Sequence, residues 1–194
     1  MTTSLRSRLT EPTALVALGA HDGLTGRIAE RSGIEALYHG GYALAAHHFG
    51  LPDVGLVGRA EVVESVRRMR AATDLPIVVD ADTGYGSEAG ADLVFVDAPR
   101  SVEEYRTIAE RCPTPCVANM SETGRSPTIP TPELEEMGYR LVIFPSTQTW
   151  VFAKAYEELC RAVVGERTTA SLADRFTSFD DVNALLGLAE WQSR

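Results

Sequence analysis

The sequence predicts an α/β protein in which parallel strands alternate with helices. Short apolar runs rich in β-branched residues are bounded by Gly and Pro, as buried strands are. Between these runs lie amphipathic stretches long enough to form helices, and polar residues collect where the strands end. Strand–helix–strand units build parallel sheets with right-handed crossovers, and ligands bind at the carboxyl ends of such strands. We therefore expect one domain with a ligand site at that edge.

The composition is that of a globular protein. The 194 residues are 44% hydrophobic and 23% charged, which is enough for one domain with a real core. The net charge of −9, with acids spread along the chain, argues against a basic face for nucleic acid. The three cysteines suit neither a disulfide framework nor a zinc site and suggest a cytoplasmic location. No apolar run approaches 18 residues, so we expect no membrane span.

The elements follow in order along the chain. We expect strands at residues 14–19, 36–38, 75–79, 93–97, 115–119 and 140–144. We expect helices at residues 23–32, 59–72, 102–111, 132–137 and 150–164. A loop or broken helix should follow Gly41 and run through His47 and His48 to Gly55.

Several side chains are predicted to start or bury these helices. Asp22 should cap the first helix, and Thr131 should cap the helix at 132–137. The inward positions predicted from helical spacing in the first and last helices are Leu24, Ile28, Ala29, Trp150, Val151, Tyr156, Leu159 and Val163.

Two carboxylates stand where the third strand stops. Asp80 and Asp82 are two residues apart, so on an extended chain both point into one pocket. Like charges this close repel and are costly to desolvate unless a cation or a proton lies between them. Oxygen ligands of this kind suit Mg²⁺, and Gly84 and Gly86 would let the backbone turn beside a ligand. The alternative is a strand that ends in a solvated acidic turn.

The other polar candidates are weaker when judged from the residues alone. Asp53 lies between Pro52 and Gly55 and could be a plain turn residue, and Asn119 could satisfy local backbone at the end of its strand. His47 and His48 are adjacent, so on a helix they diverge and cannot chelate one ion together. His21 and His39 lie near strand ends, where a lone histidine is more often structural. There is no dinucleotide fingerprint, no Walker sequence and no Gly-x-Ser-x-Gly elbow.

Six blocks of the chain carry a recognisable pattern. They are the stretch Asp80-Ala81-Asp82-Thr83-Gly84-Tyr85-Gly86 and residues 18–22, 50–55, 94–99, 118–127 and 179–188. In this order along the chain they resemble the isocitrate lyase/phosphoenolpyruvate mutase superfamily, and the stretch from Asp80 to Gly86 is similar to its metal motif. The small bacterial members, such as 2-methylisocitrate lyase and oxaloacetate decarboxylase, look closest.

The resemblance implies a TIM-barrel-like parallel (β/α) barrel that binds Mg²⁺ or Mn²⁺ and acts on a small 2-oxo or 2-hydroxy carboxylic acid. The implied reaction is a carbon–carbon cleavage or a decarboxylation through a metal-stabilised enolate. Asp80 and Asp82 would hold the metal, and Asp53 and Asp82 would act in catalysis through metal-bound waters. The implied substrate-binding residues are Tyr38, Gly40, Gly41, Asn119, Glu122, Gly124 and Pro127.

The chain departs from the family pattern after Gly86. About two strand–helix units are missing there, and with them would go a metal-shell Glu, a Lys-x-Cys-Gly-His loop and a substrate-binding Arg. Gly40 stands where many members have Ser, and Asp97 replaces the usual Glu. None of the cysteines lies in a Cys-Gly-His context, so none inherits the catalytic role. We therefore expect a barrel truncated to about six strands, open or covered at the gap.

Three hypotheses about function follow. The chain is a Mg²⁺-dependent lyase-type enzyme, or a degenerate relative that binds a carboxylate or a protein partner with weak or no turnover. The third is that the parent protein carries the missing segment and is an ordinary enzyme. A Cα distance from Gly86 to Ser87 much longer than about 3.8 Å would show this.

The tail is the last predicted feature. We expect residues 1–166 to form the truncated barrel and residues 167–194 a helical extension that joins a homo-oligomer. The extension carries an apolar stripe that a single chain has little core left to bury. Its members are Phe179, Val182, Leu185, Leu186, Leu188 and Trp191.

Overall fold

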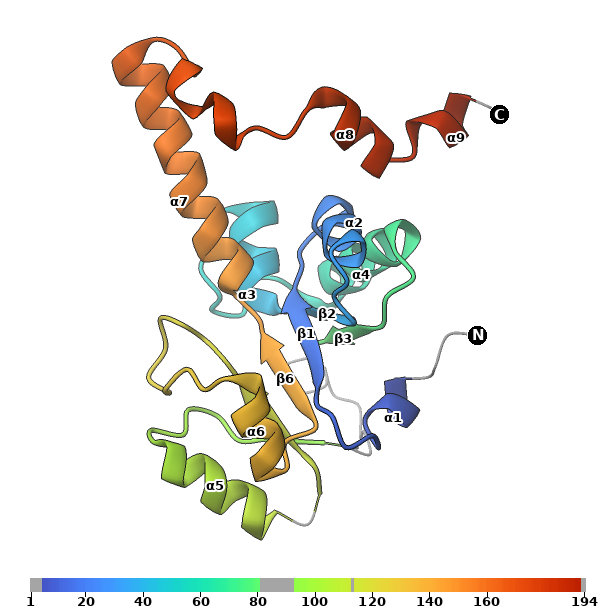
Figure 1. Ribbon diagram of the computed structural model, residues 1–194, viewed down its shortest axis with the longest axis vertical. Coiled ribbons are helices and arrows are strands. Elements are labelled where there is room, and N and C mark those ends of the chain that lie inside the picture. The colour runs from blue at the N-terminus through green and yellow to red at the C-terminus, as the bar shows by residue number, and fades with distance from the viewer. Residues whose placement is uncertain (1–4, 81–92, 113, 193–194) are drawn as a thin grey trace. The chain divides into compact units, whose positions relative to one another are not determined.

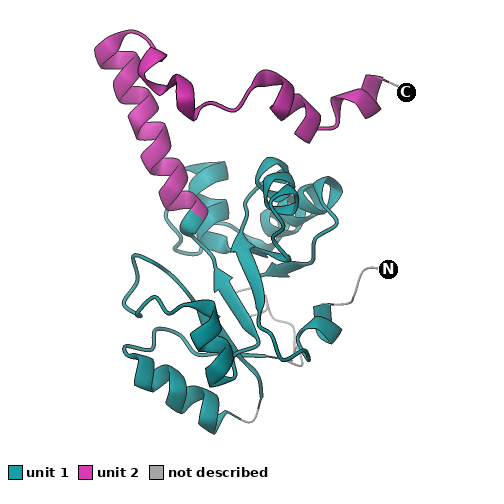
Figure 2. Cartoon of the chain, in the orientation of Figure 1, with its two compact units in different colours: residues 1–147 teal, residues 148–194 magenta. Residues whose placement is uncertain are grey.

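The computed structural model describes residues 5–80, 93–112 and 114–192 of the chain. The chain divides into two compact units, Met1–Thr147 and Gln148–Arg194, which Figure 2 shows in different colours. The first unit contains the whole described sheet and every described residue of the predicted site. The predicted division into a truncated barrel, residues 1–166, and a helical extension, residues 167–194, stays a prediction.

A single parallel sheet forms the centre of the first unit, as the strand–helix alternation predicts. Its strands are β1 (Leu15–Gly19), β2 (Ala36–His39), β3 (Ile77–Val79), β4 (Val94–Phe95), β5 (Cys116–Asn119) and β6 (Leu141–Phe144). Their order across the sheet is β3-β2-β1-β6-β5-β4, and each neighbouring pair is parallel. The sheet curls into a half-barrel, and β3 and β4 are the edges of its described part. The truncated-barrel prediction is confirmed.

Helices connect these strands and pack on the outside of the sheet. The helices of the first unit are α1 (Leu5–Arg8), α2 (Gly23–Arg31), α3 (Gly41–Leu44), the π-helix η1 (Ala45–Phe49), α4 (Arg59–Ala72), α5 (Val102–Arg111) and α6 (Thr131–Met137). After Phe144 come α7 (Thr147–Arg161), the π-helix η3 (Ala162–Glu166), the 3₁₀ helix η4 (Ala170–Arg175), α8 (Phe179–Leu185) and α9 (Leu188–Gln192). In Figure 1, α2 lies beside α4, and α5 lies beside α6. No helix in the described ranges is long and apolar enough to cross a membrane.

Local chemistry explains most helix starts, with one correction. Asp22 caps α2 as predicted, because its Oδ1 accepts the Thr25 N–H at 2.8 Å and the Thr25 hydroxyl accepts the Asp22 N–H at 3.2 Å. The prediction that Thr131 caps the helix at residues 132–137 is wrong. Thr131 is the first helical residue of α6, and Pro130 occupies the capping position without a side-chain hydrogen bond.

The sheet has a core on each face because successive side chains of a strand alternate. On the concave face, Leu15, Ala17, Ala36, Leu141 and Ile143 form one buried cluster. The convex face packs against helices in two groups. The group under α2 and α4 is Ala20, Ala29, Leu37 and Met69, and the group under α5 and α6 includes Tyr105, Ala118, Leu134 and Val142.

Some predicted inward residues face solvent instead. Ala29 is buried on α2, but Leu24 and Ile28 are each more than 40% exposed, because α2 turns Gly26 and Ala29 toward the sheet. On α7, Trp150 and Leu159 are half-buried, whereas Val151 and Tyr156 are exposed, as is Val163 in η3. Helical spacing identified apolar faces here, but not which face the fold buries.

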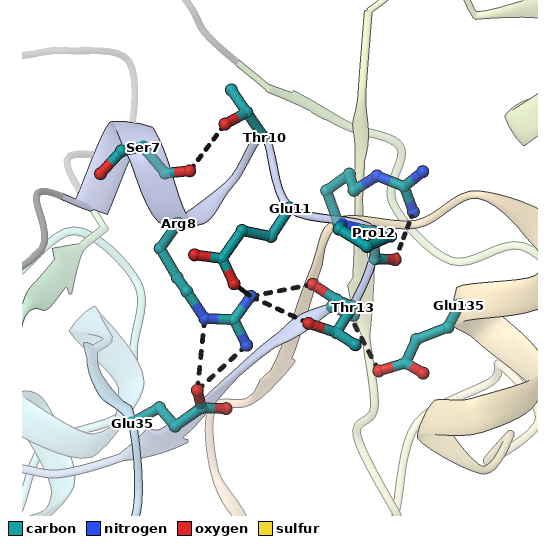
Figure 3. Close-up of polar contacts among 10 residues, drawn as sticks. Ser7, Arg8, Thr10, Glu11, Pro12, Thr13, Glu35 and Glu135 are labelled. Atoms are coloured by element: carbon teal, nitrogen blue, oxygen red, sulfur yellow. Dashed lines mark hydrogen bonds and ion pairs between the residues drawn. The ribbon is translucent and has the colours of Figure 1, made fainter.

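Arg8 fastens the first helix to the amino end of the sheet (Figure 3). Its guanidinium donates to Glu35 Oε1 from Nε at 3.3 Å and from Nη2 at 3.0 Å. Nη1 donates to the carbonyl oxygen of Thr13 at 3.0 Å and lies 3.3 Å from Glu11 Oε2. The Arg8 side chain is only 17% exposed, whereas its partner Glu35 is 49% exposed. It connects α1 to the starts of both β1 and β2.

Candidate functional site

Asp80 stands at the carboxyl end of β3, where the sequence places it. Its backbone N–H donates to the carbonyl oxygen of His39 at 2.9 Å, so the sheet hydrogen bonding extends one residue past the strand. The Tyr38 hydroxyl donates to Asp80 Oδ2 at 3.1 Å. Asp80 and Tyr38 therefore come from neighbouring strands, and the phenol holds one carboxylate oxygen in place.

The concave face beneath Asp80 contains an open cavity of about 320 Å³. Its lining residues are Tyr38, Val78, Val79, Asp80, Phe95, Val117, Leu141 and Ile143. The cavity walls are mostly aliphatic, and Tyr38 and Asp80 supply polar atoms. A ligand at Asp80 would therefore meet a charged group beside an apolar wall.

Asn119 lies at the carboxyl end of β5, two residues after Val117, and so faces the same concave side. Its Oδ1 atom is buried and has no hydrogen-bond partner among the described residues. An unpaired buried amide oxygen is unfavourable in a finished core and is typical of a site that awaits a ligand or water. The prediction that Asn119 belongs to the site gains support from this atom.

Gly40 and Gly41 follow β2 at the same edge of the sheet. Gly40 is buried at the start of α3, and a Cβ built on it would lie 2.8 Å from Cε1 of the Tyr38 ring. The ring thus fills the space that a serine would need at this position. A Cβ on Gly41 would lie 3.5 Å from an Asp53 carboxylate oxygen, so Asp53 reaches back to this turn.

The loop after β5 carries the other predicted substrate-binding residues. Glu122 accepts a hydrogen bond from the Thr147 hydroxyl at 2.5 Å, which ties this loop to the segment after β6. Gly124 donates its N–H to the Ser121 carbonyl oxygen at 3.0 Å and closes a tight turn. Pro127 is half-buried, and Ile129 beyond it is fully buried.

The donor set fits a hard divalent cation in type. Asp80 offers a carboxylate, and oxygen ligands are the ones that Mg²⁺ prefers. Within the described residues, no group of three or more His, Cys, Asp or Glu could hold a metal ion. Asp82 lies outside the described residues, as do Gly86 and Ser87.

A histidine cluster near this edge was not predicted. His21 follows β1, is buried, and stacks on His47 of η1 with ring centroids 3.5 Å apart and an interplanar angle of 12°. Nε2 of His48 lies 2.7 Å from the His21 carbonyl oxygen. Burial first, and then the neighbouring His47, lower the pKa of His21 to about 4. Sequence spacing excluded joint chelation by His47 and His48 but could not show that a third histidine meets them.

Cys116 and His39 are both buried in the core of the first unit. Cys116 is buried, and burial raises the pKa of its thiol to about 11, so it is not a thiolate at neutral pH. His39 is buried on the convex face with its Nε2 2.8 Å from the Ser65 hydroxyl, and burial lowers the pKa of its ring. That no cysteine inherits the catalytic role, and that the lone histidines are structural, stay predictions.

Comparison with known proteins adds a family to this geometry. The family model described as phosphoenolpyruvate phosphomutase matches residues 5–89, which include β1, β2, β3 and Asp80. In sequence, the chain is similar to members of the phosphoenolpyruvate mutase/isocitrate lyase superfamily.

Two curated relatives align along nearly the whole chain. One is a 2,3-dimethylmalate lyase of Eubacterium barkeri, 27% identical over 269 aligned positions that cover 95% of this chain and 93% of the relative. The other is a 2-methylisocitrate lyase of Halalkalibacterium halodurans, 28% identical, with 93% of this chain and 90% of the relative covered. Since 95% of 194 residues is about 184, about 85 of the 269 positions in the first alignment have no counterpart here. This agrees with the predicted loss of about two strand–helix units.

The fold is also that of solved superfamily members. A crystal structure of 2,3-dimethylmalate lyase superposes with a TM-score of 0.87 at 22% sequence identity, covering 99% of this chain and 95% of that chain. The half-barrel therefore has the fold of that structure.

Proposed function

We propose that the chain is a Mg²⁺- or Mn²⁺-dependent lyase-type enzyme of its superfamily that acts on a small 2-oxo or 2-hydroxy carboxylic acid. The observation that carries the proposal is the Asp80 carboxylate, held by the Tyr38 hydroxyl at the carboxyl end of β3 and open to the concave cavity. In parallel barrels this end of the strands is where catalytic groups are placed.

Asp80, with Asp82 two residues on, would hold the cation. When bound, the ion would supply Lewis-acid stabilisation of negative charge on the substrate oxygen. Tyr38 fixes the Asp80 carboxylate by donating to Oδ2. Asp53, whose carboxylate lies next to Gly41, would act on a ligand bound at this turn.

The substrate carboxylates would be held at two places along the carboxyl edge of the sheet, one after β2 and one after β5. Backbone groups at Gly40 and Gly41 approach a ligand closely because no side chain intervenes. Asn119 faces the concave side with its amide, and the loop of Glu122, Gly124 and Pro127 would cover the far end. These roles follow the resemblance residue by residue.

Names of similar proteins support the substrate class. The relatives include lyases of 2,3-dimethylmalate and 2-methylisocitrate, both small branched carboxylic acids. A phosphonopyruvate hydrolase of the same fold, with a TM-score of 0.83 at 14% identity, was solved with oxalate and Mg²⁺. Oxalate is therefore a suitable probe for the site proposed here.

A second candidate is a relative that binds a carboxylate with weak or no turnover. The observation that favours it is the absence of about 85 aligned positions. A site that is not closed admits water, which weakens electrostatic stabilisation of developing charge. Groups that act as a unit in catalysis also fail together when one is removed.

Turnover distinguishes the two candidates. The chain is assayed with Mg²⁺ and, in turn, oxaloacetate, 2-methylisocitrate and phosphonopyruvate. If the chain is the proposed enzyme, one of these acids is turned over in a metal-dependent reaction that is lost in Asp80→Ala. A rate near 10 s⁻¹, that of an ordinary enzyme, would reject the weak-turnover candidate. Metal-dependent binding with no turnover of any substrate would favour it over the enzyme.

A further inference from the structure

The π-helix η1 lies directly before the loop that carries Asp53. It spans Ala45–Phe49 and ends at Gly50, whose φ of +63° places it in the left-handed region. Three residues later, Asp53 brings its carboxylate to Gly41 at the start of α3. One π-helical turn is uncommon in proteins and often marks a functional position. Because the connection is only three residues long, the position of η1 sets the position of Asp53.

Two contacts fasten η1 to the end of β1. The His47 ring stacks face to face on the buried His21 ring, and His48 Nε2 bonds to the His21 carbonyl oxygen at 2.7 Å. His21 cannot move easily, since its side chain is 8% exposed and its segment follows a central strand. Apart from these contacts, the outer part of the turn is open, because His48 and Phe49 are both exposed. The stack and the buried Ala45 therefore anchor η1.

We infer that His47 is a positioning residue, which holds η1 against His21 and thereby holds the Asp53 loop against Gly41. The expected effect of His47 on ligand binding rests on the proposed function. The anchoring of η1 by His47 does not depend on it. A ring at position 47 is required, because the contact is face to face.

The stack is also sensitive to acid. The groups that interact electrostatically with its two rings are Asp22 at the start of α2, His48 on η1 and His39 on β2. Burial lowers the pKa of both His21 and His47, so the rings are neutral near pH 7. Protonation of both would place like charges in a face-to-face pair, and the Asp22 carboxylate is an opposing charge that acts on both rings.

The test is hydrogen exchange of peptides covering residues 45–55, measured on the whole chain. Removing the ring in His47→Ala should accelerate exchange there about two- to tenfold, the range that follows from an aromatic pair, and leave peptides of α6 unchanged. His47→Phe keeps the stack and should restore protection. In the wild type, acid should accelerate the exchange of residues 45–55 after correction for the intrinsic rate. This acceleration should be smaller in His47→Phe, because phenylalanine cannot be protonated. Phe49→Ala, on the same turn but outside the stack, serves as the matched control and should leave residues 50–55 protected.

Oxalate affinity in the presence of Mg²⁺ gives the second measurement. His47→Ala should bind oxalate several-fold more weakly than the wild type, and His47→Phe should bind it as the wild type does. The inference would be overturned if His47→Ala left the exchange of residues 45–55 unchanged, or if His47→Phe lost as much protection as His47→Ala. Faster exchange in His47→Ala with unaltered oxalate affinity would also overturn it. If the wild type binds no oxalate, the proposed function fails, and the exchange of residues 45–55 still decides whether His47 anchors the turn.

Discussion

Gly40 and Tyr38 depend on one another. The space a serine would take at position 40 is filled by the Tyr38 ring, and that ring delivers the hydroxyl that holds Asp80. We expect Gly40→Ser to push the ring away, to destabilise the fold by about 1–3 kcal/mol, as overpacked cores are, and to weaken metal-dependent oxalate binding. Urea unfolding and calorimetry check both effects. Gly165→Ser is the control, because a Cβ there meets nothing within 4 Å. Equal stability of the two variants would contradict the account.

His21 gives the protein a stability that depends on pH. Its pKa is about 4 in the folded chain against 6.5 for an ordinary histidine, so below pH 6.5 the unfolded chain binds the proton more readily. The stability is fully present above pH 6.5 and is lost as the pH falls to 4, by roughly 3 kcal/mol. His21→Phe keeps a ring but cannot be protonated. We expect the free energy of unfolding of the wild type to fall more steeply than that of this variant between pH 7 and 4; parallel curves would contradict this.

At the scale of elements, the Arg8 cluster should fix α1 to the sheet. Replacing Arg8 by Met keeps much of the apolar stem but removes the bonds to Glu35 and Thr13. We expect a loss of about 1–2 kcal/mol in the free energy of unfolding, because the donor is largely shielded and one acceptor is half-exposed. Arg67→Met is the matched control. Its side chain is 71% exposed and pairs only with Glu64 in the described contacts, so it should cost less than about 0.5 kcal/mol. Similar losses in the two variants would show that the cluster adds nothing.

Sequence reasoning predicted most elements because hydrophobic period and turn residues are local signals. The helices at Arg59–Ala72 and Val102–Arg111 have the predicted bounds. The capping prediction for Thr131 failed because Pro130 already supplies the extended conformation before the helix. The exposure of Leu24 and Ile28 could not be foreseen, since an apolar stripe does not say which part of it the sheet covers.

The candidate site was predictable only in part, for a similar reason. Strand ends placed Asp80 and Asn119 on one edge, because parallel strands share their direction. The Tyr38–Asp80 bond and the His21–His47 stack join residues 42 and 26 positions apart, and no local pattern encodes such pairs. Without an alignment of relatives, the contact between His21 and His47 had no signal in the sequence.

At the scale of the whole molecule, the tail is the feature that a single chain leaves unexplained. Phe179 is 81% exposed and Trp191 65% exposed, which is costly for large apolar side chains on one helical segment. We propose that this segment packs on a second copy of the chain. Sedimentation at micromolar concentration should show a species larger than the 21.0 kDa monomer. The double variant Phe179→Ser/Trp191→Ser should dissociate, whereas Leu56→Ser, an exposed residue of the first unit, should not; a wild-type monomer would contradict the proposal.

The central claim is that a half-barrel still holds a divalent cation and a small carboxylate at Asp80. Calorimetric titration of the whole chain with oxalate, with and without Mg²⁺, tests it most directly. We predict weak binding that requires Mg²⁺ and is lost in Asp80→Ala, while that variant keeps the wild-type unfolding midpoint within a few degrees. Oxalate binding that is independent of Mg²⁺, or that survives in Asp80→Ala, would contradict the claim.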